Sequence, residues 1–320
     1  MTKNFFLFIV LMRALAAIII TNAHYTGVYP TDLIANGGLL GDVLFFAVSG
    51  FCLANSSGSF GKWYLKRFVR VYIPSWLMTL IYMLMGAYVA SSLQDIINFF
   101  VWPTHWHFVA SIIILYVPLF FASKYIEMNR KNYCSIAVGV IVLQLIIYLA
   151  IYDKSYYHID NVREPMIEFL FFQAMLLGLH FRWKCDNKLT NSRLDYIHIG
   201  GGILLLATYF ASKLLFVKYN VLSSFQLLNQ IVLWMMLYSL FQIFMSIESR
   251  LKKIEHTKLW KCVGFVADRT LEIYLVQYVI LDYLKIGPFP LNWLILTLTI
   301  FVSAIGLRWL SQILIKRINI

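Results

Sequence analysis

The stretch from residue 5 to residue 25 reads FFLFIVLMRALAAIIITNAHY and is apolar over most of its length. A helix that crosses a bilayer needs about 20 such residues. Similar apolar ranges recur along the chain, at 39–55, 71–90, 107–123, 133–152, 165–181, 196–217, 223–246, 263–284 and 292–315. These ranges predict an all-α, polytopic membrane helical bundle of about ten transmembrane helices.

Composition supports the membrane class. The chain has 320 residues, of which 61% are hydrophobic and 13% charged, and its mean hydropathy is +0.73. Soluble domains carry about 25% charged and about 45–50% apolar residues, so a soluble, disordered, collagenous or disulfide-stapled protein is excluded. Ten helices with short loops use the whole chain, which predicts a single integral membrane domain over residues 1–320.

Basic residues alternate from loop to loop. The loops after the even-numbered apolar ranges are rich in Lys and Arg, whereas the opposite loops hold only Lys154, Arg163, Lys218 and Lys285. This positive-inside bias predicts that both termini are cytoplasmic, in a multi-pass membrane protein. The net charge of +12 then reflects topology and contact with membrane lipid, and no nucleic acid is expected as a partner. The residues on the basic side are Lys3, Lys62, Lys66, Arg67, Arg70, Lys124, Arg130, Lys131, Arg182, Lys184, Lys188, Arg193, Arg250, Lys252, Lys253, Lys258, Lys261, Lys316 and Arg317.

Charged and polar residues inside apolar ranges point to function, because they are expensive there and usually face a cavity or a partner. Arg13 and His24 lie eleven positions apart in the first range. At about 100° per residue they project from nearly one face, with a rise of about 16 Å between them. Alternatively, His24 is an ordinary histidine at the membrane interface, and Arg13 packs against a carbonyl group of the protein.

Asp42 begins the second range at about the depth predicted for His24. A carboxylate beside an imidazole can fix its tautomer and raise its basicity; alternatively, free backbone N–H groups at a helix start would satisfy it. Arg67 and Arg70 are three residues apart in the basic loop that precedes the third range. Two guanidinium groups on one helical face suit a phosphate, although plain positive-inside anchoring would also explain them.

These segments together resemble the acyltransferase-3 family of integral membrane acyltransferases. The resemblance rests on Arg-x10-His at 13–24, Phe-Phe-x-x-Ser-Gly-Phe at 45–51, and Arg-x-x-Arg followed by Tyr-x-Pro at 67–74. The segment WHFVAS at 106–111 is similar to the opening of the family's fourth helix, and LEIYLVQ at 271–277 to its ninth. Two positions depart from the family pattern. Asp42 lies one position earlier than in many members, and Gln277 stands where many members have histidine.

The resemblance implies transfer of an acetyl or similar acyl group from acetyl-CoA to a hydroxyl of a surface polysaccharide or a lipid-linked oligosaccharide. Carried over residue by residue, His24 matches the catalytic histidine and Arg13 its paired arginine, which also contacts the donor. Arg67 and Arg70 match the pair associated with the CoA phosphates. No metal is expected, and the oligomeric state is left open.

Three further residues are candidates for the acceptor site. Trp106 and His107 are predicted beside an outer loop, where an aromatic belt at the membrane interface is the alternative. Glu168 lies one turn into the sixth range and is a second candidate to orient His24. Glu272, in the ninth range, is expected to form a structural ion pair with Arg308 or Lys213.

The membrane sides predicted for the arginine pair and for His24 suggest how the acyl group is transferred. The nucleotide of acetyl-CoA would stay at Arg67 and Arg70, and its pantetheine arm, about 15–20 Å long and comparable to the rise along the first helix, would reach His24. His24 would then deprotonate the acceptor hydroxyl. A transporter or flippase for a polysaccharide precursor fits the composition equally well, but it would release no CoA from acetyl-CoA. A structural scaffold is a third possibility, and it would tolerate the loss of His24.

Overall fold

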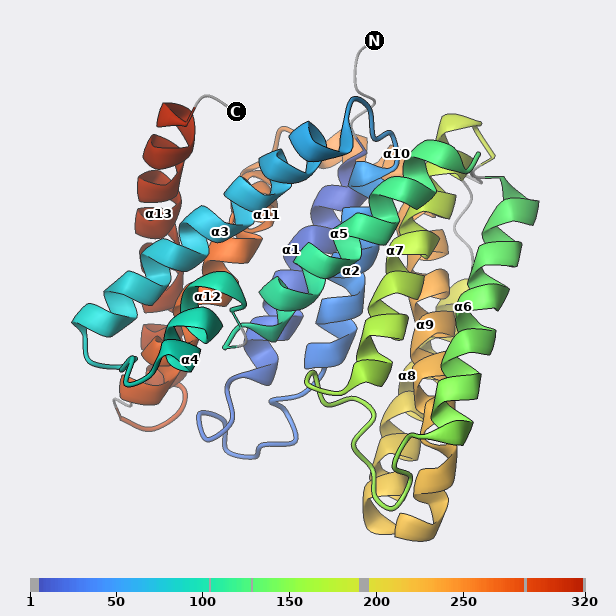
Figure 1. Ribbon diagram of the computed structural model, residues 1–320, viewed down its shortest axis with the longest axis horizontal. Helices are drawn as coiled ribbons and strands as arrows, with labels where there is room; N and C mark the ends of the chain where they lie inside the picture. The colour runs from blue at the N-terminus through green and yellow to red at the C-terminus, as the bar shows by residue number, and fades with distance from the viewer. Residues whose placement is uncertain (1–5, 104, 128, 190–195, 285–286, 319–320) are drawn as a thin grey trace. The chain divides into compact units, whose positions relative to one another are not determined.

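The computed structural model describes residues 6–103, 105–127, 129–189, 196–284 and 287–318, and these residues form helices and connecting loops without a strand (Figure 1). In chain order the elements are α1 (Leu7–Ala23), α2 (Gly38–Leu53), α3 (Phe60–Leu84), α4 (Leu93–Ile96), η1 (Ile97–Val101), α5 (His107–Tyr125), α6 (Arg130–Ala150), α7 (Pro165–Asp186), α8 (Tyr196–Lys218), η2 (Asn220–Phe225), α9 (Leu227–Ser246), α10 (Glu248–Ile254), α11 (Lys258–Ala267), α12 (Thr270–Tyr283) and α13 (Leu291–Arg317).

The all-α class is confirmed, and each of the ten predicted ranges contains a helix. By length and composition, five described helices are able to cross a membrane, namely α5, α6, α8, α9 and α13, and α1 and α2 are shorter apolar helices. The count of ten spans and the cytoplasmic side of both termini stay predictions. Lys3, Arg193 and Lys285, as well as residue 5 at the predicted start of the first helix, lie outside the described residues.

The chain divides into two compact units. Unit 1 contains the chain up to Met12, Val43–Ser56 and Pro118–Lys261; unit 2 contains Arg13–Asp42, Ser57–Val117 and the chain from Cys262 onward. The boundaries fall inside α1, α2, α5 and α11 and in the loop between α2 and α3. The prediction of one functional domain over residues 1–320 is not tested by this division.

The third helix begins eleven residues earlier than predicted, at Phe60, so the basic run that carries Arg67 and Arg70 is helical. Lys, Arg and Leu are good helix formers, but a search for apolar runs does not detect them. Pro74 lies inside this helix and carries no N–H for the carbonyl of Arg70. The hydroxyl of Ser75 bonds the next carbonyl, that of Val71, at 2.8 Å.

The ninth predicted helix is interrupted at Asp268 and Arg269, which separates α11 from α12. Arg269 has non-helical backbone angles, and its guanidinium donates to the carbonyl of Phe265 at 3.0 Å and lies 4.0 Å from the centre of that ring. Its side chain thus caps α11. Just beyond the break, Arg308 binds Glu272 at 3.1 Å, which confirms that predicted ion pair, whereas Lys213 pairs with Asp160 at 2.7 Å.

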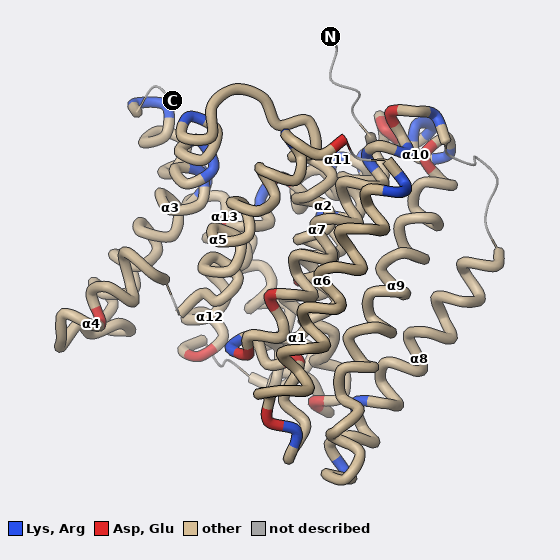
Figure 2. Tube along the Cα trace, turned by 45° about the vertical axis from the view of Figure 1, so that its right-hand side comes forward, with Lys and Arg blue, Asp and Glu red and all other residues tan. Residues whose placement is uncertain are grey.

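In unit 1, α2 and α7 pack with glycines at their contact. A Cβ on Gly178 would overlap the carbonyl oxygen of Ala47, and one on Gly50 would overlap that of Met175. Small residues let membrane helices approach this closely. The antiparallel pair α8 and α9 lies beside α7 in the same unit (Figure 1). Many charged residues lie near α10, and few lie along α8 and α9 (Figure 2).

Four buried glutamines hold unit 1 together through their side-chain amides. Gln144 donates to Gln230 at 2.7 Å and accepts from Gln173 at 2.9 Å, and Gln230 also donates to the carbonyl of Ile159. Gln226 accepts from the backbone N–H groups of residues 158 and 159, each at 2.9 Å, and donates to the carbonyl of residue 156. In this unit, buried amides are therefore paired, as polar groups in an apolar interior must be.

Candidate active site

Most of the residues expected to act in catalysis or donor binding fall in one unit. Unit 2 contains Arg13 and His24 from α1 and the loop after it, Asp42 from α2, Arg67 and Arg70 from α3, and Trp106 and His107 at the start of α5. Glu168 lies in the first turn of α7, in unit 1. That Glu168 orients His24 or contacts the acceptor stays a prediction.

The first turn of α2 is held against α1 by Gly41. A Cβ at this position would lie 2.6 Å from Cγ1 of Ile20 and 2.9 Å from the carbonyl oxygen of Ala16. Only a glycine permits this approach. Because Asp42 is the next residue, the same contact fixes where its carboxyl group enters unit 2.

His24 lies one residue beyond the end of α1, and its N–H donates to the carbonyl of Thr21 at 3.1 Å, so the chain continues for another tight turn. The side chain is half-buried. Its imidazole packs edge-on against the ring of Tyr278 of α12, with 4.8 Å between the ring centres. Asp282, one helical turn after Tyr278, acts on His24 electrostatically. The helix α12 therefore supplies both a packing partner and a carboxylate for the imidazole.

Asp42 has a different set of neighbours. Its side chain is buried, at 9% exposure. Its charge acts on Tyr274 and Tyr278, whose rings meet at right angles with 5.5 Å between their centres. Tyr278 is thus linked to His24 by ring packing and to Asp42 electrostatically, whereas the carboxylate that acts on His24 itself is that of Asp282.

Aromatic side chains from α3 and the start of α5 continue this region. The hydroxyl of Tyr82 donates to the carbonyl of Leu275 in α12 at 2.7 Å. The ring of Trp106 lies 6.3 Å from that of Tyr82 and 6.1 Å from that of Tyr88, and Phe108 contacts Tyr274 at 5.3 Å. Trp106 is almost fully buried and His107 half-buried, so Trp106 belongs to the interior rather than to an exposed aromatic belt.

Arg67 and Arg70 lie on α3, as neighbours whose charges interact. The guanidinium of Arg67 donates to the carbonyl of Trp63 at 3.0 Å and stacks over the Trp63 ring at 4.3 Å. Trp63 itself is buried against Tyr116 of α5. Arg67 is thus held in place while Arg70 is exposed, an arrangement that leaves two adjacent cations available to a phosphate. Arg13 lies half-buried in α1.

Among the described residues of unit 2 that are at most 1% exposed, three carry a side-chain polar group without a hydrogen-bond partner. They are the indole N–H of Trp106, the hydroxyl of Thr79 in α3, and the whole side-chain amide of Gln277 in α12. All three residues are at most 1% exposed. An unsatisfied buried polar group costs about 1–3 kcal/mol, so such groups call for a specific explanation.

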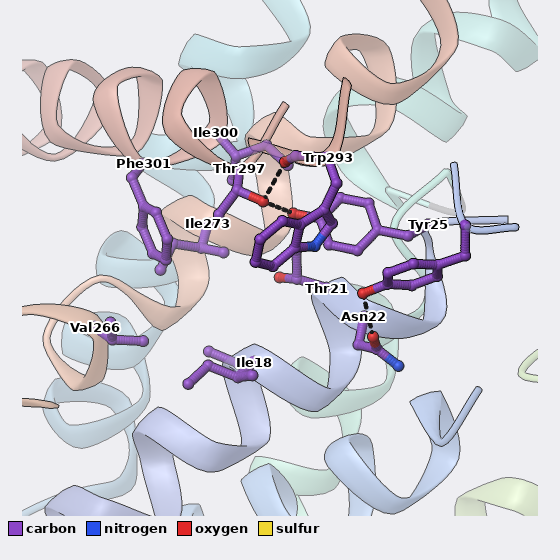
Figure 3. Close-up of a pocket in the computed structure, with 12 residues that line it drawn as sticks. Ile18, Thr21, Asn22, Tyr25, Val266, Ile273, Trp293, Thr297, Ile300 and Phe301 are labelled. Carbon is purple, nitrogen blue, oxygen red and sulfur yellow. Dashed lines mark hydrogen bonds between the residues drawn. The ribbon is translucent and has the colours of Figure 1, made fainter. Parts of the chain in front are cut away.

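A cavity of about 300 Å³ opens beside α1 in the same unit (Figure 3). Its wall is mainly apolar, with Ile18 of α1 facing Ile273, Ile300 and Phe301. Hydrogen bonds tie the polar part of the wall together, from Tyr25 to Thr297 and from Tyr29 to Asn22, both at 2.7 Å. The described lining includes none of the predicted catalytic or donor-binding residues.

Sequence patterns identified neither Tyr278 nor Asp282 as part of this site, and Gln277 only as a departure from the family pattern. Asp282 carries a usable signal, because an ionisable residue at the end of an apolar range is a candidate by default. Tyr278 carries none, since aromatic side chains are common in such helices. Its place in the site follows from its contact with His24, far away along the chain.

Comparison with known proteins is informative at the level of the family. A family model described as an acyltransferase domain, Acyl_transf_3, matches residues 6–311 and so covers nearly the whole chain. No curated protein and no solved structure shows a significant match.

Proposed function

Because the chain belongs to the acyltransferase-3 family, we propose that it is a membrane O-acyltransferase that moves an acetyl or similar acyl group from acyl-CoA to a glycan hydroxyl. The acceptor is a surface polysaccharide or a lipid-linked oligosaccharide on the outer side of a bacterial inner membrane. The observation that carries the proposal within the family is the placement of His24, half-buried against Tyr278 with the carboxylate of Asp282 acting on it.

His24 acts as the general base in this proposal. It accepts the proton of the acceptor hydroxyl, whose oxygen attacks the thioester carbonyl. Asp282 favours the imidazolium that forms, and the Tyr278 ring limits the orientations of the imidazole. Asp42 acts through the tyrosine pair. Direct transfer to the acceptor, without an acyl-enzyme, is part of the proposal.

The role of Asp282 can be measured against that of Asp42. Asp282→Asn is expected to lower kcat about 10-fold to 100-fold, the usual effect of losing a group that orients a reacting side chain, with the KM for acetyl-CoA unchanged. Asp42→Asn is expected to have a smaller effect, since its charge acts on Tyr274 and Tyr278. A larger loss in Asp42→Asn than in Asp282→Asn would assign the orienting role to Asp42.

Arg67 and Arg70 bind the donor in this proposal. Replacing Arg67 with Ala is expected to raise the KM for acetyl-CoA more than it lowers kcat, and Lys should restore affinity only partly, because an ammonium lacks the planar fork. Titration of detergent-solubilised protein with acetyl-CoA measures the affinity directly. If the Arg67→Ala, Arg70→Ala double variant bound acetyl-CoA like the wild type, the pair would serve membrane anchoring only.

One observation favours the transporter alternative, namely the interruption between α11 and α12, because transporters often place binding sites at discontinuous helices. Release of CoA from acetyl-CoA by membranes that contain the protein separates the two functions. The acyltransferase releases CoA in proportion to acylated acceptor, and the release depends on His24. A transporter or a scaffold releases none.

A further inference from the structure

Among the described residues of unit 2, Gln277 is the buried side chain with two polar atoms that lack a hydrogen-bond partner, and the proposed mechanism gives it no role. It is fully buried, at 0% exposure, and neither its amide nitrogen nor its amide oxygen has a hydrogen-bond partner among the described residues. The four buried glutamines of unit 1, in contrast, all have bonded amides. Two donors and an acceptor are therefore held unused in an apolar interior, which is unfavourable unless a bound group uses them.

The position of Gln277 on α12 links it to the candidate site through its neighbours on that helix. It directly precedes Tyr278, whose ring packs against His24 at 4.8 Å. It lies three residues after Tyr274, which contacts Phe108 at 5.3 Å, so the two share a helical face. Two residues before it, the carbonyl of Leu275 accepts a hydrogen bond from the Tyr82 hydroxyl. This turn of α12 is thus bounded by His24 of the α1 end and by the aromatic residues of α3 and α5.

A second unpaired donor belongs to the same unit. The indole N–H of Trp106 is buried without a partner among the described residues, and its ring lies 6.3 Å from that of Tyr82, whose hydroxyl donates to the carbonyl of Leu275 in α12. Neutral N–H donors are groups that can stabilise an oxyanion in acyl transfer.

We infer that the side-chain amide of Gln277 donates a hydrogen bond to the carbonyl oxygen of the thioester during transfer, with the Trp106 indole N–H as the second donor. This inference rests on the proposed acyltransferase function and adds the group that binds the developing negative charge. It also explains why a polar side chain is retained where nothing else in the described unit bonds to it.

The step balances as follows. The acceptor hydroxyl oxygen forms a bond to the thioester carbon as His24 takes its proton, and the π electron pair of the carbonyl moves to the oxygen that Gln277 and Trp106 face. When the tetrahedral species collapses, this pair re-forms the C=O bond and the C–S bond breaks with its electrons on sulfur. The CoA thiolate then takes the proton from His24, giving the ester and free CoA.

Gln277→Met tests the inference, because methionine has a similar unbranched shape and no N–H donor. The expected result is a fall in kcat of about 100-fold to 1,000-fold, a KM for acetyl-CoA within about twofold of the wild type, and an unchanged or raised unfolding temperature, since an unpaired buried amide is removed. Gln230→Met is the matched control. It removes a bonded amide from unit 1 and is expected to lower the unfolding temperature while the folded fraction keeps its kcat.

A wild-type kcat in folded Gln277→Met, or a change confined to KM, would overturn the inference. If Gln277→Met did not fold, Gln277→Asn, which keeps the amide on a shorter stem, should show a kcat reduced about tenfold with an unchanged KM; an unchanged kcat in this variant would overturn it as well. Failure of the proposed function gives a different result, because wild-type protein would then release no CoA from acetyl-CoA at all.

Discussion

His24→Ala is expected to lower kcat/KM about 100-fold to 10,000-fold, the range that a general base contributes, and to leave the protein folded in the membrane. The imidazole is half-buried and its ring contacts Tyr278, so its removal opens a small space without leaving a buried charge unpaired. Transfer of labelled acetyl groups from acetyl-CoA by purified protein in proteoliposomes measures the loss. Elution as a single species in detergent measures the fold.

His256→Ala is the matched control. This histidine is exposed between α10 and α11, in unit 1, and its replacement should leave transfer unchanged. Substantial activity in a folded His24→Ala variant would show that some other group accepts the proton of the acceptor. The contacts made by Tyr278 and Asp282 would then be structural only.

Gly178→Val prevents the packing of α7 on α2. The first atom of any side chain at Gly178 would overlap the carbonyl oxygen of Ala47 and lie 2.6 Å from the backbone nitrogen of Phe51. Backbone atoms cannot move aside as a flexible side chain can, so the helices must separate. The expected loss is at least about 3 kcal/mol of folding free energy, seen as aggregated protein after extraction or a much lower unfolding temperature.

Gly139→Ala provides the comparison for this variant. Gly139 lies within α6 of the same unit, and a Cβ there meets no other atom within 4 Å. Alanine also favours a helix over glycine, so stability should be unchanged or slightly higher. If Gly178→Val unfolded at the same temperature as the wild type, the close contact between α2 and α7 would be absent from the protein.

Apolar runs of spanning length were enough to predict where the long helices lie, because lipid contact demands apolar side chains on every exposed face. The same reasoning missed the true start of α3, since Lys62 and Arg67 favour a helix without being apolar. It also missed the break before α12. No Gly or Pro marks the break, and the capping contact from Arg269 to Phe265 depends on one side chain's position.

The candidate site could likewise be predicted only in part from the sequence. Charged residues within apolar ranges led to Arg13, His24 and Asp42, because a charge in a membrane helix requires a reason. The partner of His24 could not be found in this way. The sequence places Asp42 at a suitable depth, but the contacts of the folded unit assign the electrostatic partner to Asp282, 258 positions from His24 along the chain. Only packing of α12 beside the end of α1 brings the two together.

Transfer across sealed vesicles tests the central proposal most directly. Purified protein is inserted into proteoliposomes. Its orientation is determined by protease access to α10, which carries Arg250 and Lys253, and labelled acetyl-CoA and a glycan acceptor are placed on chosen sides. The proposal predicts labelled acceptor only when acetyl-CoA is on the side of Arg67 and Arg70 and the acceptor is on the opposite side, with one CoA released for each acetyl group transferred. Transfer with acetyl-CoA on the other side only, or with both substrates required on one side, would contradict the roles assigned to these arginines and to His24.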